Sequence, residues 1–139
     1  MKVKLTCALL GAALLSVARF AQVNENPIRV GLMLPYSGSF SPFGNAIENG
    51  FKLYVHEQGG KLVGRELVYY KVDDESNITK ATDNVNRLIQ NDKVDFIIGT
   101  VHSGVAVSLV YTAKETDTTL IVPNAGAIPL PTFCAAPIF

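Results

Sequence analysis

The stretch VDFIIGTVHSGVAVSLV, from Val94 to Val110, decides the fold. Its first half is rich in apolar and β-branched residues, which favour a strand, and the run stops at Gly99. From Ser103 onward the apolar residues recur at the spacing of a helix. A strand that passes into a helix through a short loop is the repeating piece of a parallel α/β sheet. We therefore expect residues 99–104 to form a loop at the edge of such a sheet.

The same alternation continues on both sides of this stretch. Strands are predicted at residues 28–34, 65–72, 94–100 and 119–126. Helices are predicted at residues 45–58, 78–89 and 103–116, with a loop at residues 35–44. The order β-α-β-α-β-α-β predicts an α/β fold: an open, mostly parallel sheet with helices on both faces. Ligands of such sheets bind outside the carboxyl ends of the strands, so the loops after the strands are the first candidates for a site.

The first 21 residues have the pattern of a cleaved secretory signal peptide. A basic start, MKVK, precedes the uncharged run LTCALLGAALLSVA, and small residues allow cleavage after Ala18 or Ala21. The alternative is a buried or membrane-anchoring helix, but the run is short for a membrane span. We therefore expect an exported, periplasmic protein whose domain covers residues 26–139.

Charge and cysteine content exclude some classes of function. Without residues 1–21 the chain has nine basic and twelve acidic residues, a net charge of −3. No basic patch is left to attract a phosphate backbone, which argues against nucleic acid as a partner. Cys134 then has no second cysteine to pair with, and the sequence predicts neither a metal site nor a cofactor.

The loop at residues 99–104 carries the strongest candidate residues. Ser103 has two roles open to it: it can cap the helix, or it can donate its hydroxyl to an anion beside the amides of Gly104 and Val105. Gly104 would let a ligand approach without a Cβ in the way. His102 can donate a hydrogen bond to a ligand or lie beside the pocket. Catalysis by His102 and Ser103 is disfavoured, because adjacent extended residues point apart and no G-x-S-x-G turn is present.

Two further loops follow strands. PYSGSFSPFG, at residues 35–44, matches neither nucleotide-binding glycine pattern, but Tyr36, Phe40 and Phe43 can cover a small organic ligand. The alternative is that one or more of these aromatic residues belongs to the core. The third loop offers small residues and one amide side chain in Asn124, Ala125 and Gly126.

The pair Asp73-Asp74 follows the second predicted strand. Paired acids can hold a metal ion or accept a phosphoryl group, as in a receiver domain. Here DDESN precedes a helix, where acids, Ser and Asn complement unpaired amides. Capping of that helix is therefore the favoured interpretation.

Four segments together resemble a known family. IRVGLMLPYSGSFSPFG, GGKLVGRELVYYKVDDESN, VDFIIGTVHSGVA and LIVPNAGA look like the first lobe of the type I periplasmic solute-binding proteins, in particular the branched-chain amino-acid receptors of ABC transporters. The resemblance implies that Ser103 and the helix start behind it hold a ligand carboxylate. It also implies contacts from residues at the positions of Phe43, Val101, Asn124 and Gly126.

The chain departs from this family in two ways. Amino-acid binders often have a hydroxyl residue where Gly126 stands, so the sequence looks more like the binders of aromatic acids or other carboxylates. Family members are commonly two to three times longer, which predicts that a second lobe is missing and that this fragment binds weakly. The resemblance implies a non-enzymatic receptor that delivers a small carboxylate to an inner-membrane permease. The rivals are a Rossmann-like or receiver-like enzyme or signalling domain, and the sensing lobe of a regulator.

Overall fold

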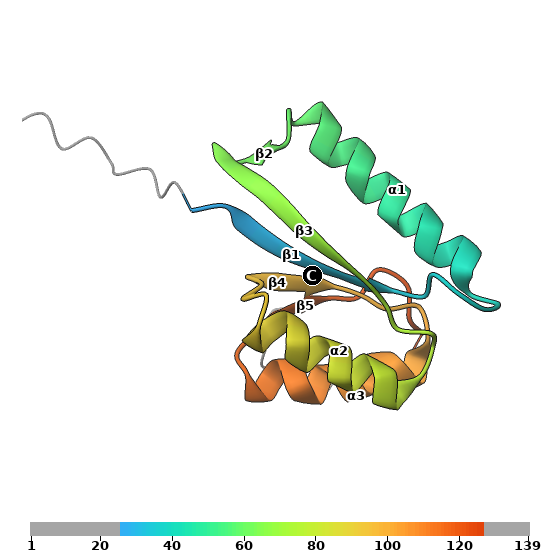
Figure 1. Cartoon of the computed structure of the whole chain (residues 1–139). Coiled ribbons are helices and arrows are strands. Elements are labelled where there is room, and N and C mark those ends of the chain that lie inside the picture. Colours follow the sequence, from blue (N-terminus) through green and yellow to red (C-terminus); the bar gives the residue numbers. More distant parts are fainter. Residues whose placement is uncertain (1–25, 127–139) are drawn as a thin grey trace, which may run out of the picture.

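The computed structural model describes residues 26–126 (Figure 1). Its elements in chain order are β1 (Ile28–Leu34), α1 (Ser41–Glu57), β2 (Lys61–Leu62), β3 (Arg65–Asp73), α2 (Ile78–Gln90), β4 (Phe96–Ile98), α3 (Ser103–Glu115) and β5 (Thr119–Ile121). The predicted alternation of strands and helices is confirmed. The predicted signal peptide, residues 1–21, and the end of the chain from residue 127 lie outside the described residues.

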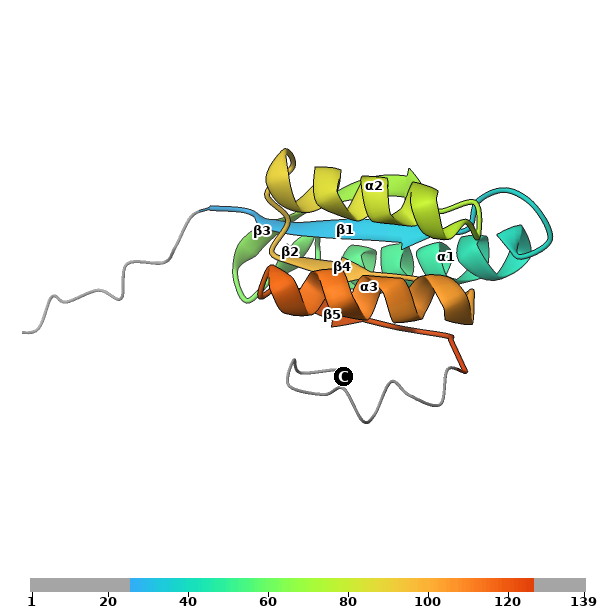
Figure 2. The same ribbon diagram turned by 90° about the horizontal axis from the view of Figure 1, so that it is seen from below.

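The strands form one sheet in the order β2-β3-β1-β4-β5. β3, β1, β4 and β5 are parallel to their neighbours, whereas the short β2 is antiparallel to β3. α1 covers one face of the sheet, and α2 and α3 cover the other (Figure 2). The fold class predicted from the sequence is therefore confirmed.

The strand order contains a topological switch point. From β1 the chain crosses through α1 to β3 on one side, and then returns through α2 to β4 on the other side of β1. The connections leave the sheet in opposite directions at this place. A crevice at the carboxyl ends of β1 and β4 is where open α/β sheets bind their ligands.

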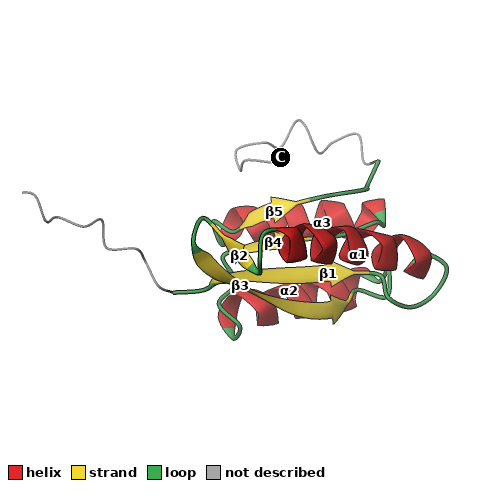
Figure 3. Ribbon diagram, turned by 90° about the horizontal axis from the view of Figure 1, so that it is seen from above, coloured by secondary structure: helices red, strands yellow, loops and turns green. Residues whose placement is uncertain are grey.

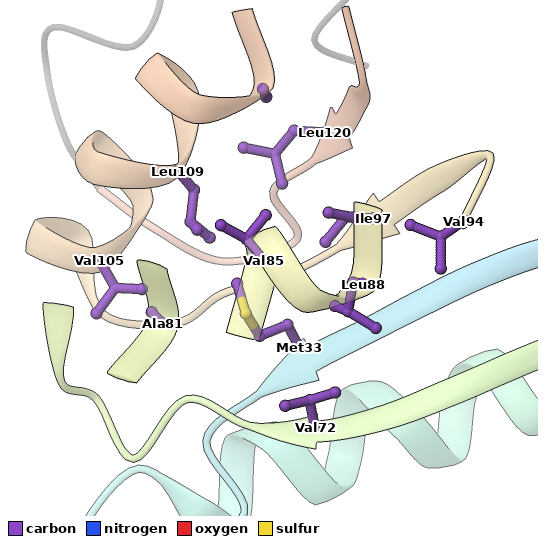
Figure 4. Close-up of a cluster of buried hydrophobic side chains, with 11 residues drawn as sticks. Met33, Val72, Ala81, Val85, Leu88, Val94, Ile97, Val105, Leu109 and Leu120 are labelled. Atoms are coloured by element: carbon purple, nitrogen blue, oxygen red, sulfur yellow. The ribbon is translucent and has the colours of Figure 1, made fainter. Parts of the chain in front are cut away.

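The main core lies between the sheet and the pair α2 and α3 (Figure 4). Its buried apolar residues are Met33, Val72, Ala81, Val85, Leu88, Val94, Ile97, Val105, Leu109, Ala113 and Leu120. A smaller cluster on the α1 face contains Ile28, Val30 and Leu32, with Phe51 among the half-buried residues packed against them.

Several local predictions differ from the structure. The strand predicted at residues 119–126 ends at Ile121, and the one predicted at residues 94–100 covers only Phe96–Ile98. Residues 41–44, predicted as loop, are the first turn of α1, where Pro42 is tolerated because the first helical amides have no partner in the helix. β2 was not predicted, because it has only two residues. It pairs with β3 through a tight turn in which Val63 and Gly64 both have positive φ.

α1 approaches the end of β1 closely. A Cβ on Gly44 would overlap the backbone carbonyl oxygen of Pro35, so only glycine permits this contact. The contact fixes the start of α1 beside the loop after β1. Of the helices in residues 26–126, none combines the length and apolar character that a membrane crossing requires.

Candidate functional site

The loops that follow β1, β3, β4 and β5 gather at one edge of the sheet (Figures 2 and 3). This arrangement follows from the parallel pairing, which places the carboxyl ends of these strands together. The residues predicted from the three strand-to-loop junctions therefore lie along a common edge.

The start of α3 differs from the prediction in two respects: Ser103 is not the cap, and the amide of Val105, expected beside a bound anion, is taken by the cap. His102, not Ser103, is the N-cap: its backbone is extended, and its Nδ1 accepts a hydrogen bond of 3.4 Å from the amide of Val105. Ser103 is the first helical residue and is exposed. Within residues 26–126 its hydroxyl has no hydrogen-bond partner, and the amides of Ser103 and Gly104 donate to no acceptor. One hydroxyl and two amides are thus left at a helix N-terminus, where a negative charge is stabilised.

Gly104 has a different role from the one expected. A Cβ on this residue would lie 3.1 Å from Cε1 of His102 and 3.6 Å from Cδ1 of Ile78. The space beside Gly104 is therefore occupied by the imidazole that caps the helix. The missing side chain accommodates His102, and ligand access is not needed to explain it.

Aromatic side chains join the loop after β1 to the start of α3. The ring of Phe40, in the loop after β1, meets His102 edge-on with ring centroids 5.9 Å apart. Phe43, in the first turn of α1, lies 6.4 Å from Phe40 and is 51% exposed. Phe40 is itself 37% exposed. These three rings form an aromatic rim, defined as Phe40, Phe43 and His102, beside the start of α3.

Tyr36 has a structural position instead. Nζ of Lys71 lies 3.8 Å from the centre of its ring, a cation–π contact. Its hydroxyl is buried near Glu48 but has no hydrogen-bond partner in the described residues. Burial and the charge of Glu48 raise the pKa of Tyr36. The sequence left a core role open for these aromatic residues, but Tyr36 is half-buried under Lys71 and belongs to neither apolar cluster.

The acids of the DDESN segment do not cap α2. The N-cap of α2 is Asn77, whose side chain accepts a 3.0 Å hydrogen bond from the amide of Lys80. Oδ1 of Asp73 instead accepts 2.9 Å hydrogen bonds from the amides of Tyr36 and Glu75. The capping prediction was therefore right for the asparagine and wrong for the two acids.

Asp74 is fully buried and holds a different loop. Its Oδ2 accepts a hydrogen bond from the hydroxyl of Thr100, which is also fully buried, and its Oδ1 accepts one of 2.8 Å from the amide of Ser76. Burial raises the pKa of Asp74, and the two hydrogen bonds oppose that effect only in part. Burial also acts on Asp73, but the hydrogen bonds donated by backbone amides outweigh it and lower the pKa of that carboxyl.

Sequence reasoning missed the contact between Asp74 and Thr100, because it depends on strand order. In the described part of the chain no group of three or more His, Cys, Asp or Glu residues is arranged to hold a metal ion.

The remaining predicted residues lie in the loops after β4 and β5, at the same edge of the sheet. Val101 is buried within the loop after β4. Asn124 and Gly126 are exposed after β5, and Ala125 is half-buried. Nothing lies within 4 Å of where a Cβ of Gly126 would be. The structure therefore brings the aromatic rim and Ser103 together and places the third loop further along the edge, after the neighbouring strand.

Comparison with known proteins places this geometry in a class. Residues 27–139 match the family of periplasmic binding proteins. The chain therefore belongs to the type I periplasmic binding proteins, the class whose lobes have this sheet.

Three similar proteins illustrate the class. The Leu/Ile/Val-binding protein BraC3 of Rhizobium johnstonii is 27% identical over 88% of this chain and 34% of its own length. A solute-binding protein of an ABC transporter from R. palustris, solved in complex with benzoate, is 51% identical, with a TM-score of 0.78 over 82% of this chain and 32% of that chain. The branched-chain amino acid binding protein LivJ of Streptococcus pneumoniae, solved with isoleucine, is 27% identical, with a TM-score of 0.71 over 77% of this chain and 31% of its own. The chain thus spans about a third of the length of these relatives.

Proposed function

We propose that the chain is the carboxylate-binding lobe of a periplasmic receptor that delivers a small organic acid to an ABC transporter permease. The observation that carries the proposal is the start of α3. There the hydroxyl of Ser103 and two amides have no partner in the described residues and lie at the switch-point edge of the sheet. Export by the signal peptide of residues 1–21 would bring this lobe to the periplasm.

An aromatic acid is the class of ligand that the site favours. The aromatic rim offers ring faces and edges to a planar ligand, and ring pairs contribute beyond the area they bury. The relative solved with benzoate is 51% identical over most of this chain. Gly126 provides no hydroxyl for an α-amino group, which disfavours a branched-chain amino acid. In this proposal Phe43 is a wall of the site, while Val101, Asn124 and Ala125 supply backbone or amide contacts.

No chemistry is proposed at this site. The relatives are named as binding proteins, and Asp74 is already engaged by Thr100 and Ser76. The enzyme and signalling alternatives are therefore not favoured. Binding to this lobe alone will be weak, because an open edge covers only one side of a small ligand.

A titration of the 139-residue chain with benzoate, followed by NMR chemical shifts, tests the proposal. We expect saturable shifts at Ser103 and Gly104, and none with the neutral analogue benzyl alcohol. Ser103→Ala should weaken benzoate binding by about 1–3 kcal/mol, as for a hydrogen bond to a charged group. Leucine in place of benzoate tests the amino-acid alternative.

Ser108→Ala is the matched control for this substitution. Ser108 lies further along α3, and its hydroxyl donates within the helix to the carbonyl oxygen of Val105 at 2.8 Å. This variant should bind benzoate as the parent chain does. Equal affinities of the Ser103 variant and the parent chain would contradict the role assigned to Ser103. Stronger binding of leucine than of benzoate would show that the ligand is an amino acid and not an aromatic acid.

A further inference from the structure

We propose that Asp73 and Asp74 are positioning residues, which set the loops after β1 and β4 on either side of the proposed ligand site. The inference rests on the proposed function for its effect on ligand affinity, but not for its structural effect. Neither acid need touch the ligand in this scheme. Asp73 acts through the loop after β1, and Asp74 acts through the loop after β4.

The two roles follow from the alternation of a strand. Asp73 is the last residue of β3, and Asp74 follows it with its amide still paired to the carbonyl of Leu34 beyond β1's last ladder pair. Consecutive side chains on such extended backbone point to opposite faces of the sheet. α1 lies on one face, and α2 and α3 lie on the other (Figure 1). The partners differ accordingly: Asp73 accepts from the amide of Tyr36, on the way to α1, and Asp74 accepts from Thr100, on the way to α3.

The contact of Asp74 also crosses the sheet. β1 lies between β3 and β4, so the hydrogen bond from Thr100 spans the carboxyl end of β1. Thr100 is two residues before His102, the cap of α3. Fixing Thr100 therefore fixes where the amides of the first turn of α3 lie relative to Phe40, whose ring meets His102.

Burial makes the hydrogen bond between Thr100 and Asp74 costly to break. Asp74 and Thr100 are both fully buried, so neither can exchange its partner for bulk water. A buried polar group that loses its partner keeps the cost of desolvation, which makes alternative loop positions unfavourable. A buried acid that only satisfied its own hydrogen bonds would affect stability alone, and this is what the experiment must distinguish.

Threonine variants of the 139-residue chain provide the test. Thr100→Val removes the hydroxyl with little change of shape, and we expect about five- to tenfold weaker benzoate binding, the size of one lost hydrogen bond. Thr100→Ser keeps the hydroxyl and should restore binding to within about twofold of the parent chain.

Thr118→Val is the matched control. Thr118 is also buried and lies after the other end of α3, and its Oγ1 accepts a hydrogen bond of 3.0 Å from the hydroxyl of Thr116. Loss of the Thr118 hydroxyl should lower the free energy of unfolding and leave the affinity for benzoate unchanged. A benzoate affinity that falls equally in the valine variants of Thr100 and Thr118 would overturn the inference.

A second measurement does not need a ligand. The amide of Val105, which donates to His102, should exchange its hydrogen faster in Thr100→Val than in Thr118→Val, once the exchange is compared at matched global stability. If the parent chain binds no carboxylate, the proposed function fails and this exchange still decides the positioning role. Equal exchange in the two variants would overturn it.

The other acid has its own pair of variants. Asp73→Ala removes the acceptor of the Tyr36 amide, whereas Asp73→Asn keeps an acceptor oxygen in the same place. We expect weaker benzoate binding in the alanine variant and recovery in the asparagine variant. If both variants bind benzoate as tightly as the parent chain, Asp73 is not a positioning residue.

Discussion

The two faces of the sheet are held in different ways. On one face, α2 and α3 bury apolar side chains such as Leu88 and Leu109 completely against the strands (Figure 4). On the other face, the 17-residue α1 buries only Gly44 and Glu48. A continuous apolar core holds the first face, whereas a smaller apolar cluster, a close backbone contact and an ionic cluster hold the second.

The ionic cluster consists of Glu48, Lys52 and Lys71. The carboxylate of Glu48 is nearly buried and lies 2.6 Å from Nζ of Lys52 and 2.7 Å from Nζ of Lys71. Burial alone would raise the pKa of Glu48, but hydrogen bonds from the two lysines bring it below its ordinary value. The comparison teaches that a small apolar cluster and a few specific contacts can fix one helix, where the other two helices share a continuous core.

The largest effect is expected on the packed face. Leu88→Ala leaves a cavity among fully buried neighbours and should lower the free energy of unfolding by about 2–5 kcal/mol. Leu53→Ala, on α1, is the control: Leu53 is 58% exposed and its loss should cost less than about 0.5 kcal/mol. Urea unfolding followed by circular dichroism measures both. Similar losses of unfolding free energy at Leu88 and Leu53 would show that the two faces of the sheet do not differ in this way.

The close contact of α1 should respond to a single methyl group. Gly44→Ala places a Cβ against the carbonyl oxygen of Pro35, and we expect a loss of about 2–3 kcal/mol from the resulting strain. Gly50→Ala adds the same methyl group where nothing lies within 4 Å, and should stabilise the helix by about 0.5–1 kcal/mol. Urea unfolding of the two variants gives the sign of each change. A neutral result at Gly44 would mean that α1 is not held by this contact.

The ionic cluster should contribute less, because both lysines are about half exposed. Glu48→Gln should lower the free energy of unfolding by about 1–2 kcal/mol at neutral pH. The folded pKa of Glu48 is lowered, so its contribution is full above the ordinary pKa of 4.5 and is lost as the pH falls through the folded pKa. Unfolding of both proteins across this range should show the difference disappear at acid pH.

Glu75→Gln is the control for this prediction. Glu75 and Lys80 form a pair on the surface at 2.9 Å, with both side chains about half exposed. Its loss should change stability by less than about 0.5 kcal/mol. A difference for Glu48 that persists unchanged at acid pH would show that its charge is not the cause.

The smallest effect is expected at the turn between β2 and β3. Val63 is 89% exposed and has a φ of 52°, a conformation that β-branched residues rarely adopt. Val63→Asn would create the Asn-Gly pair preferred in such a turn and should raise stability by about 0.5–1 kcal/mol. Val63→Ile keeps the branched Cβ and should bring no gain. Thermal unfolding of the two variants compares them directly.

Sequence reasoning predicted the elements that have strong local signals. The apolar run at 28–34 is β1, and the helix predicted from Ser103 begins there. The edge that carries the candidate site followed from the alternation alone. The start of α1 was predicted four residues late, because Ser, Gly and Pro are equally typical of a loop and of a first helical turn.

The parts that could not be predicted depend on distant contacts. Either His102 or Ser103 can cap a helix, and only the backbone conformation at the junction decides between them. The roles of Asp73 and Asp74 require the knowledge that β3 and β4 flank β1. The alternation of strands and helices leaves that order open.

The two neighbouring acids make the function of β3 depend on whether its number of residues is odd or even. Removing one residue between the β2–β3 turn and Asp73 would shift the register by one. Asp73 would then point to the face of α2 and α3, and Asp74 to the face of α1. Removing two residues would restore the original sides with a shorter strand. Length variation in β3 should therefore be tolerated only in even steps.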